Sequence, residues 1–308
     1  MNRKLGIVLG MTVLTSILGG CSNTPTQPEK ATAEPKMAEE KEKEKTPYEV
    51  LESAVKKNQQ WTSWSTHTTS HTKQPDIHGG TDKVFEIDHD EYANCQKLDD
   101  GYYDAASWDV GDWGQFRIVY VKDKMYQLTG YSANAPAPMN GHIGFRAFEL
   151  SKKALEANRQ PISMNEAFKE TDLFEATQTK EGDKTTIAFQ LKDSKKFQDF
   201  LLNEDKDNER TETLDNGLEV NKDYYTQYDF TYVVDKEGLV ESYSYVMTEK
   251  YTEDKEGTYS SEVTFYNPDQ VNWDVETIDA IFDQIPKDQD EGDFTTDLTF
   301  TATKPEGK

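Results

Sequence analysis

The segment Tyr228-Asp229-Phe230-Thr231-Tyr232-Val233-Val234-Asp235-Lys236-Glu237-Gly238 carries the clearest fold signal in the chain. Aromatic or aliphatic side chains stand at every second position from Tyr228 to Val234, and a turn-forming tetrapeptide follows them. This alternation predicts a β-strand with one buried face. Further strand segments over 239–247 and 259–265 are joined by a second Asp-Lys-Glu-Gly turn. We therefore predict a three-stranded antiparallel meander.

The segments before the meander are also rich in β-forming residues, and short turns separate them. We predict strands over 61–69, 84–88, 92–98, 102–108, 116–120, 125–131, 174–179 and 185–191. Short turns favour antiparallel neighbours, because parallel strands need a crossover connection of about a dozen residues or more.

Capping signals and apolar spacing predict the helices. Thr46, Pro47 and Glu49 form a capping box with proline at the first helical position, so a helix is expected over about 47–59. Four more are predicted: from Phe145 to Asn158, after Ser163, after Asp193, and over 274–285. This order predicts an α+β fold, in which one large antiparallel sheet carries helices on one face.

The N-terminal segment is built like a bacterial lipoprotein signal peptide. Basic Arg3 and Lys4 precede an uncharged apolar stretch over 5–18, and Leu18-Gly19-Gly20-Cys21 ends it. The stretch is shorter than the roughly 18–20 residues that span a bilayer as a helix. We predict cleavage before Cys21, a lipid on its sulfur, and attachment to the cell membrane with the protein facing the outside. A plain secretory signal or an uncleaved anchor is the alternative.

The composition changes along the chain and suggests how the chain divides into segments. We expect a signal peptide over 1–20, then the lipidated Cys21 and a disordered charged tether over 21–46. An α+β domain over 47–286 follows, and an acidic tail over 287–308 contains one edge strand, from Phe294 to Phe300.

The net charge of −24 bears on the partners. Such a surface repels phosphate backbones, so nucleic acid is not expected as a partner. Anionic lipid headgroups would repel the domain as well. The chain has two cysteines, and with Cys21 lipidated Cys95 has no disulfide partner. We interpret Cys95 as a half-buried strand residue, and a reactive thiol is the alternative.

The sequence shows no motif that names a reaction. The Ser70-His71-Thr72-Lys73 match to S-x-x-K falls on a predicted strand and lacks its companion motifs. His67 and His71 would share a strand face about 13 Å apart, too far for one metal, although a site with Asp76 and His78 is conceivable. The acidic runs over 205–216 and 288–292 depart from the EF-hand pattern. We expect no enzyme activity, cofactor or metal.

The layout resembles uncharacterised exported lipoproteins of Gram-positive bacteria that are similar to the LolA-like lipoprotein-carrier fold. The resemblance rests on the Cys21 box, the capped helix leading into a Trp-Thr-Ser strand, the Val121-Lys122-Asp123-Lys124-Met125-Tyr126 hairpin and the strand-turn over 232–238. It implies an incomplete antiparallel barrel, a large curved sheet with helices on its concave face. Members of that wider group carry acyl chains, bind lipids or sense misfolded envelope proteins.

Three functions follow as hypotheses. The first is a lipoprotein that binds an apolar or lipid-like ligand; the second is an envelope interaction or sensor lipoprotein with a packed core; the third is an unrecognised cell-envelope hydrolase. An apolar cavity would favour the first, a packed interior the second, and converging carboxylates in a polar cavity the third. For the first hypothesis, the expected ligand-lining residues are Phe145, Phe148, Leu155, Tyr228, Phe230, Tyr232, Tyr243, Tyr245 and Phe265.

Overall fold

Antiparallel strands dominate the architecture. The computed structural model describes residues 45–77, 82–97, 102–110, 113–121, 124–132, 138–148, 160–204, 211–213, 217, 219–221, 224–271 and 275–301. The strands are β1 (Ser63–Pro75), β2 (Val84–Lys97), β3 (Tyr102–Val110), β4 (Trp113–Val121), β5 (Met125–Ser132), β6 (Pro138–Phe148), β7 (Phe174–Glu181), β8 (Lys184–Leu191), β9 (Thr211–Thr213), β10 (Glu219–Asn221), β11 (Tyr225–Val234), β12 (Val240–Lys250), β13 (Glu256–Tyr266) and β14 (Glu291–Thr301).

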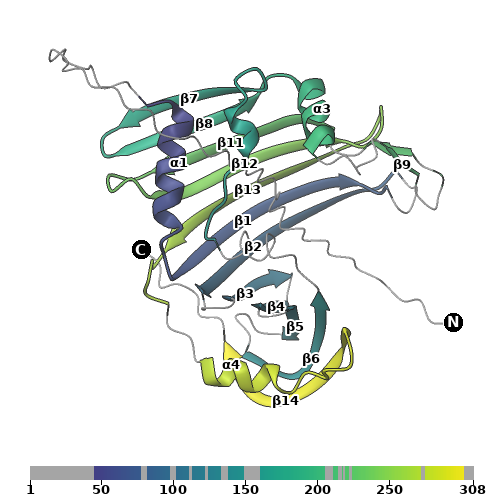
Figure 1. The fold of residues 1–308 in the computed structure, drawn as a ribbon. Coiled ribbons are helices and arrows are strands. Elements are labelled where there is room, and N and C mark those ends of the chain that lie inside the picture. The colour runs from purple at the N-terminus through teal and green to yellow at the C-terminus, as the bar shows by residue number, and fades with distance from the viewer. Residues whose placement is uncertain are drawn as a thin grey trace, which may run out of the picture.

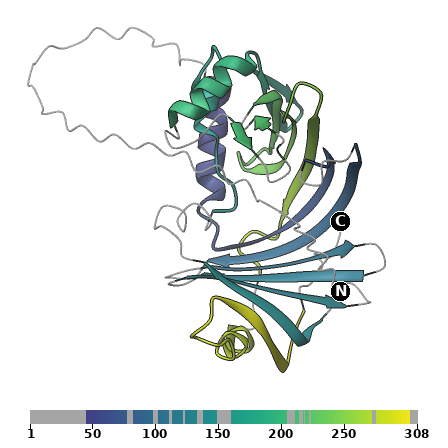
Figure 2. The ribbon, with the colours of Figure 1, turned by 90° about the vertical axis from the view of Figure 1, so that its right-hand side faces the viewer.

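One large sheet contains all of these strands except β9 and β10. Its twelve strands follow the order β14-β6-β5-β4-β3-β2-β1-β13-β12-β11-β8-β7 (Figure 1). The sheet is not closed, since β14 and β7 form its two edges. Figure 2 shows that the sheet bends between the end that carries β7 and the end that carries β14. The α+β prediction with a large antiparallel sheet is confirmed at this level.

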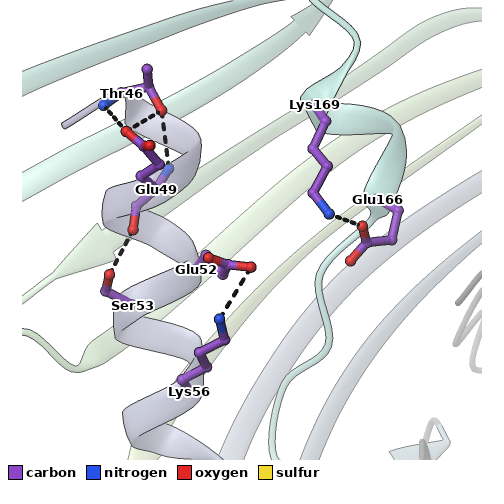
Figure 3. A network of polar contacts seen from close by, with 7 residues as sticks. All are labelled: Thr46, Glu49, Glu52, Ser53, Lys56, Glu166 and Lys169. Carbon is purple, nitrogen blue, oxygen red and sulfur yellow. Dashed lines mark hydrogen bonds and ion pairs between the residues drawn. The ribbon is translucent and has the colours of Figure 1, made fainter. Parts of the chain in front are cut away.

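The first helix begins where its capping box predicts. In α1 (Pro47–Asn58), the Thr46 side chain accepts a hydrogen bond from the Glu49 backbone N–H at 3.3 Å, and the Glu49 carboxylate accepts one from the Thr46 N–H at 2.8 Å (Figure 3). One turn further on, Glu52 and Lys56 form an ion pair at 3.2 Å. These reciprocal bonds satisfy backbone donors that the first helical turn leaves without partners.

Among the residues that the structure describes, three further helical segments are η1 (Glu166–Lys169), α3 (Ser194–Glu204) and α4 (Val275–Phe282). The Asp193 carboxylate accepts hydrogen bonds from two backbone N–H groups of α3, as its capping role predicts. The short helix predicted after Ser163 starts later, because the side chain of Asn165 provides its cap. Helix α4 falls within the predicted range and contacts β14.

The main core lies between the sheet and the helices α1, η1 and α3. Leu51 of α1, Phe168 of η1 and Phe197 of α3 are buried in one cluster with Phe189 of β8 and Tyr232 of β11. The Phe168 ring stacks on Phe189 with centroids 4.4 Å apart. Burial of these rings supplies the apolar contact area that holds the helices on the sheet.

The helix predicted from Phe145 to Asn158 is wrong over its first turn, because Phe145 and Phe148 lie on strand β6. Ile143 and Phe145 are buried while Arg146 is exposed, which is the alternation of a strand. The Phe145 backbone is paired with Leu128 of β5 and Gly292 of β14. The three-residue spacing of Phe145 and Phe148 therefore imitates a helix by coincidence. Leu155 lies outside the residues that the structure describes.

The predicted meander is confirmed as β11, β12 and β13. Phe230 pairs with Tyr245 and Tyr245 with Ser261, so these three residues lie in one row across the three strands. Gly238 in the first turn has φ +75°, a conformation that favours glycine. Strand β14 pairs with β6, so the sheet continues into the acidic segment after residue 286.

Candidate functional site

The face of the sheet that packs against α1, η1 and α3 is here called the inner face. Directly paired residues of neighbouring strands lie on the same face of a sheet. One row across the inner face consists of Phe230, Tyr245, Ser261, Ser70 and His89, and the next consists of Tyr232, Tyr243, Val263, Thr68 and Glu91. Both rows change from aromatic side chains on β11 and β12 to polar side chains on β1 and β2.

The structure separates the predicted ligand-lining residues into two groups. Phe145 and Phe148 are on β6, and seven strands lie between β6 and β11 in the sheet. The buried Phe145 ring lies 6.2 Å from Phe294 of β14, so it belongs to the packing at that end of the sheet. The second group gathers on the inner face of the meander: Tyr228, Phe230, Tyr232, Tyr243, Tyr245 and Phe265.

Part of this second group is covered by the protein's own side chains. Tyr228, Tyr232 and Phe265 are buried. Phe197 of α3 lies 4.9 Å from Tyr228, and Phe168 of η1 approaches Tyr232 edge-on. We call this region, in which helical side chains cover β8 and β11, the packed half of the inner face. Its rings form core structure.

The remaining aromatic residues are more accessible. Phe230, Tyr243 and Tyr245 are half-buried, with Phe230 and Tyr245 stacked at 5.3 Å. Beside them, the β1 side chains Thr66, Thr68, Ser70 and Thr72 are also half-buried, and we call these four residues the hydroxyl strip. Aromatic and hydroxyl groups together give this part of the inner face both apolar contact area and hydrogen-bonding capacity.

A histidine and a carboxylate lie beyond the hydroxyl strip. His89 Nε2 is 3.3 Å from Glu91 Oε2, and their side chains are only 5% and 14% exposed. Ionisable groups at this depth are retained when they are hydrogen-bonded, because transfer of an unsatisfied polar group from water is costly. No motif in the sequence marks this pair. The sequence feature that could have found it is the alternation of side chains along β2, which places both residues on the face that also carries Ala93 and Cys95.

Burial changes the acid–base properties of the tyrosines. It raises the pKa of Tyr232 and of Tyr243 well above the usual range of a phenol. Burial also raises the pKa of Tyr245, and a hydrogen bond with Ser261 opposes that rise. These phenols therefore stay protonated at physiological pH and act as neutral hydrogen-bonding groups.

The opposite face of the β1–β2 hairpin carries the histidines that the sequence suggested. His67 Nε2 lies 2.9 Å from Asp90 Oδ1, and His71 Nδ1 lies 2.8 Å from Asp88 Oδ1. Each histidine thus has its own carboxylate, as expected for residues that share a strand face but lie far apart. Within the described segments, no three His, Cys, Asp or Glu residues are grouped as metal ligands would be.

The remaining candidates are placed as follows. Ser70 and Lys73 lie on opposite faces of β1, and Lys73 pairs with Glu86 at 2.7 Å, so the S-x-x-K match forms no site. Cys95 is half-buried on β2, as predicted. Cys21, His78 and the 205–210 loop lie outside the described residues. No helix in the described part of the chain has the length and apolar character needed to cross a membrane.

Comparison with protein families gives no match to any family model, and no curated protein matches the chain. Evidence on the function therefore comes from the geometry of the inner face.

Proposed function

We propose that this protein is a membrane-anchored lipoprotein whose extracytoplasmic domain binds an apolar or lipid-like ligand without catalysing a reaction. The observation that carries the proposal is the half-buried patch formed by Phe230, Tyr243 and Tyr245. These rings continue the aromatic core but are less covered than the rings under the helices. An apolar ligand would remove this ring surface from water, at about 25 cal/mol per Å² of buried area.

The proposed fold is the incomplete barrel of the LolA-like carriers, with helices on the concave face. In this arrangement the packed half forms the floor beneath α1, η1 and α3. The ligand would contact the half-buried rings and the hydroxyl strip, where the sheet continues into β1 and β2. Phe145 and Phe148 are no longer part of the proposed site, because β6 lies at the other end of the sheet.

The anchor follows from the N-terminal sequence. Lipid on Cys21 would supply two acyl chains, which is enough for stable attachment where one chain is marginal. The charged tether would separate the acidic domain from anionic headgroups that repel it. Replacing Cys21 with Ala should release the protein from the membrane fraction and abolish labelling with a radioactive fatty acid. Retention of both would contradict the anchor.

Ligand binding is tested with a fluorescent fatty-acid probe on the purified domain. The wild type should take up the probe saturably, and Tyr245→Ala should weaken uptake at least several-fold. Tyr266→Ala is the matched control, since Tyr266 is also half-buried on the meander but lies on the opposite face. Absence of saturable uptake, or equal losses in the two variants, would refute the proposed site.

A second candidate function is docking of an envelope protein. It is favoured by Val84, Phe85 and Ile87 of β2, which are 54%, 46% and 43% exposed. Phe85 and Ile87 lie on one face of β2 and Val84 lies on the other. Two large apolar side chains exposed next to each other are unusual on a surface that only contacts water. If docking is the function, the double variant Phe85→Ser/Ile87→Ser should lose cross-links to envelope proteins in cells while the fatty-acid probe binds neither protein.

A further inference from the structure

The β1–β2 hairpin extends beyond the strand that lies on the other side of β2. Strand β2 pairs with β1 from Val84 to Gln96. Its pairing with β3 begins only at Glu91, opposite Trp108. Figure 2 shows the two strands of the hairpin curving away from the strands that follow them in the sheet. Among the residues that the structure describes, no strand pairs with β2 on its β3 side over 84–88, and we call this segment the free edge.

Two hydrogen bonds at the ends of β2 fix the direction of its backbone groups. The Lys83 carbonyl accepts from the Asp76 N–H at 2.9 Å, just before the strand. The Lys97 N–H donates to the Thr62 carbonyl at 2.8 Å, so odd-numbered residues at both ends point toward β1, and the register between them is continuous. Successive residues of a strand direct their N–H and C=O groups to opposite sides. The even-numbered residues of the free edge therefore direct these groups away from β1: Val84, Glu86 and Asp88.

The side chains of this segment divide into an apolar and an acidic set. Phe85 and Ile87 lie on the inner face and are exposed. Glu86, Asp88 and Asp90 lie on the opposite face, here called the outer face, and are also exposed. A strand added at the free edge would thus meet unpaired backbone groups in its plane, aromatic and aliphatic surface on one side and carboxylates on the other.

The outer face at the free edge is acidic. With histidine counted as neutral, the outer-face positions of β1 and β2 carry three carboxylates and one ammonium group. That ammonium group belongs to Lys73, which pairs with Glu86 at 2.7 Å, and the side chain of Asp88 is 90% exposed. Exposed ion pairs add little affinity, but they discriminate between partners of opposite charge. Basic residues of a partner are therefore favoured on this side.

A second copy of this chain is the poorer occupant of the free edge. A two-fold axis at Glu86 or at Asp88 would place two identical carboxylates opposite each other, and an axis between them would place Glu86 opposite Asp88. Like charges directly opposite destabilise a strand pair. Each copy also carries a net charge of −24, which opposes association.

We propose that the free edge binds an extended segment of a partner polypeptide, in which Lys or Arg alternates with apolar residues, as an added antiparallel strand. Directly opposite residues of antiparallel strands share a face, so the basic side chains lie against Glu86 and Asp88. The apolar side chains lie against Phe85 and Ile87, and backbone hydrogen bonds join the two strands. This surface is separate from the aromatic patch of the proposed function and does not depend on a lipid ligand.

Fluorescent heptapeptides test the proposal by co-sedimentation with the full-length protein in phosphatidylcholine vesicles, with protein-free vesicles as the blank. At about 0.15 M salt, where charges are screened beyond about 8 Å, Lys-Val-Lys-Val-Lys-Val-Lys should bind saturably. Its isomer Lys-Lys-Val-Val-Val-Lys-Lys has the same charge without the alternation and should bind at least ten-fold more weakly. Glu-Val-Glu-Val-Glu-Val-Glu should not bind. Equal affinity of the isomer or of the acidic peptide would overturn the proposal.

Backbone methylation of the peptide tests the strand pairing itself. In the alternating peptide, the lysine N–H groups would face β2, because residues directly opposite the outward groups exchange hydrogen bonds with them. N-methylation of the lysines should weaken binding at least ten-fold. N-methylation of the valines blocks the far side of the peptide and should change the affinity less than about two-fold. Equal losses in the two methylated peptides would overturn the proposed pairing.

Proline substitutions test the edge on the protein. Glu86→Pro removes an outward N–H, which an edge strand tolerates, and should weaken binding at least ten-fold, whereas Glu86→Gln keeps the N–H and should lose less. Gln178→Pro is the matched control on edge strand β7. The Lys192 N–H donates to the Leu173 carbonyl at 2.8 Å, so odd-numbered residues of β7 face β8 and the exposed Gln178 points outward as well. Equal binding by Glu86→Pro and the wild type would overturn the proposal. Circular dichroism melting curves report folding, and the peptide series on the wild type remains decisive if Glu86→Pro does not fold.

The remaining outcomes separate this proposal from its rivals. If no peptide binds and sedimentation velocity shows dimers that Glu86→Pro abolishes, a second copy occupies the edge and the proposal is wrong. If the peptides bind protein-free vesicles equally well, the proposal is wrong too. Saturable uptake of the fatty-acid probe without peptide binding leaves the proposed function standing and overturns this inference alone.

Discussion

The packed half and the polar end of the inner face are built on one continuous sheet, yet they satisfy their side chains in different ways. Under the helices, Phe168, Phe189 and Phe197 fill the space above β8 and β11, and all three rings are buried. Toward β2, the same face carries half-buried hydroxyl groups and the His89–Glu91 pair. The two parts of this face therefore bury different kinds of side chain: aromatic rings beneath the helices, and a hydrogen-bonded histidine–carboxylate pair on β2.

The largest expected loss of stability comes from a substitution in the packed half. Phe168→Ala should lower the free energy of unfolding by about 3–5 kcal/mol, because the ring is buried against Phe189 and Phe230. Tyr245→Ala should cost less than about half as much, since a half-buried ring loses less contact area. Urea denaturation measures both. Equal losses would mean that the inner face is packed throughout and has no room for a ligand.

A smaller loss of stability is expected from a substitution that removes the hydrogen bonds between α1 and β12. The buried Asn58 side chain donates to the Val240 carbonyl at 2.8 Å and accepts from the Val240 N–H at 2.9 Å. Asn58→Ala leaves both backbone groups of β12 without these partners and should cost about 2–3 kcal/mol. Gln60→Ala removes an exposed hydrogen bond of the same helix and should be close to neutral. A neutral Asn58→Ala would show that water replaces the amide.

Asp269 holds the residue that precedes β1 in place. Its carboxylate accepts hydrogen bonds from the Thr62 N–H at 2.6 Å and the Thr62 hydroxyl at 2.8 Å. Asp269→Ala should cost about 1 kcal/mol. Asp269→Asn should cost less, because Asn retains an acceptor and tolerates the positive φ of 56° at this position.

The same contact predicts a pH dependence. The hydrogen bonds from Thr62 hold the pKa of Asp269 below its usual range. A depressed carboxyl pKa contributes stability above the unfolded value of about 4, and this contribution is lost as the pH falls through the folded value. Melting temperatures between pH 7 and pH 2.5 should therefore converge for the wild type and Asp269→Asn at the acidic end. Parallel curves would contradict the assignment.

The smallest effect is expected on the outer face of the hairpin. Asp88→Asn removes the partner of His71, and both side chains of this pair are exposed to solvent. Exposed ion pairs contribute little, so the change in stability should stay within about 0.5 kcal/mol. A loss above about 1 kcal/mol, measured by urea denaturation at low and high salt, would show that the outer face also contributes to the fold.

Local signals in the sequence predicted much of the fold. The capping box of α1, the Asp193 cap and the alternating meander each depend on residues close together in the chain, and all three are confirmed. Strand β6 was mistaken for a helix because Phe145 and Phe148 share a helical spacing. Its actual pattern is completed by pairing with β14, which is more than a hundred residues away along the chain.

The candidate site was less predictable for the same physical reason. The aromatic residues of the meander gather because adjacent hairpins bring them together. His89 and Glu91 join their row only through the pairing of β2 with β1 and of β1 with β13. Which face of β2 is covered depends on this order of strands, and the order cannot be obtained from the local pattern of one strand.

The edge strand β7 affects whether many molecules of this protein aggregate with one another. It is the last strand in the order, so its outer backbone groups could pair with a strand of a neighbouring molecule. After the buried Phe174, every residue from Glu175 to Glu181 is exposed, and Lys180 and Glu181 are charged. Such polar, charged edges discourage intermolecular β-pairing. A protein crowded on a membrane surface would thereby resist aggregation while keeping an open sheet.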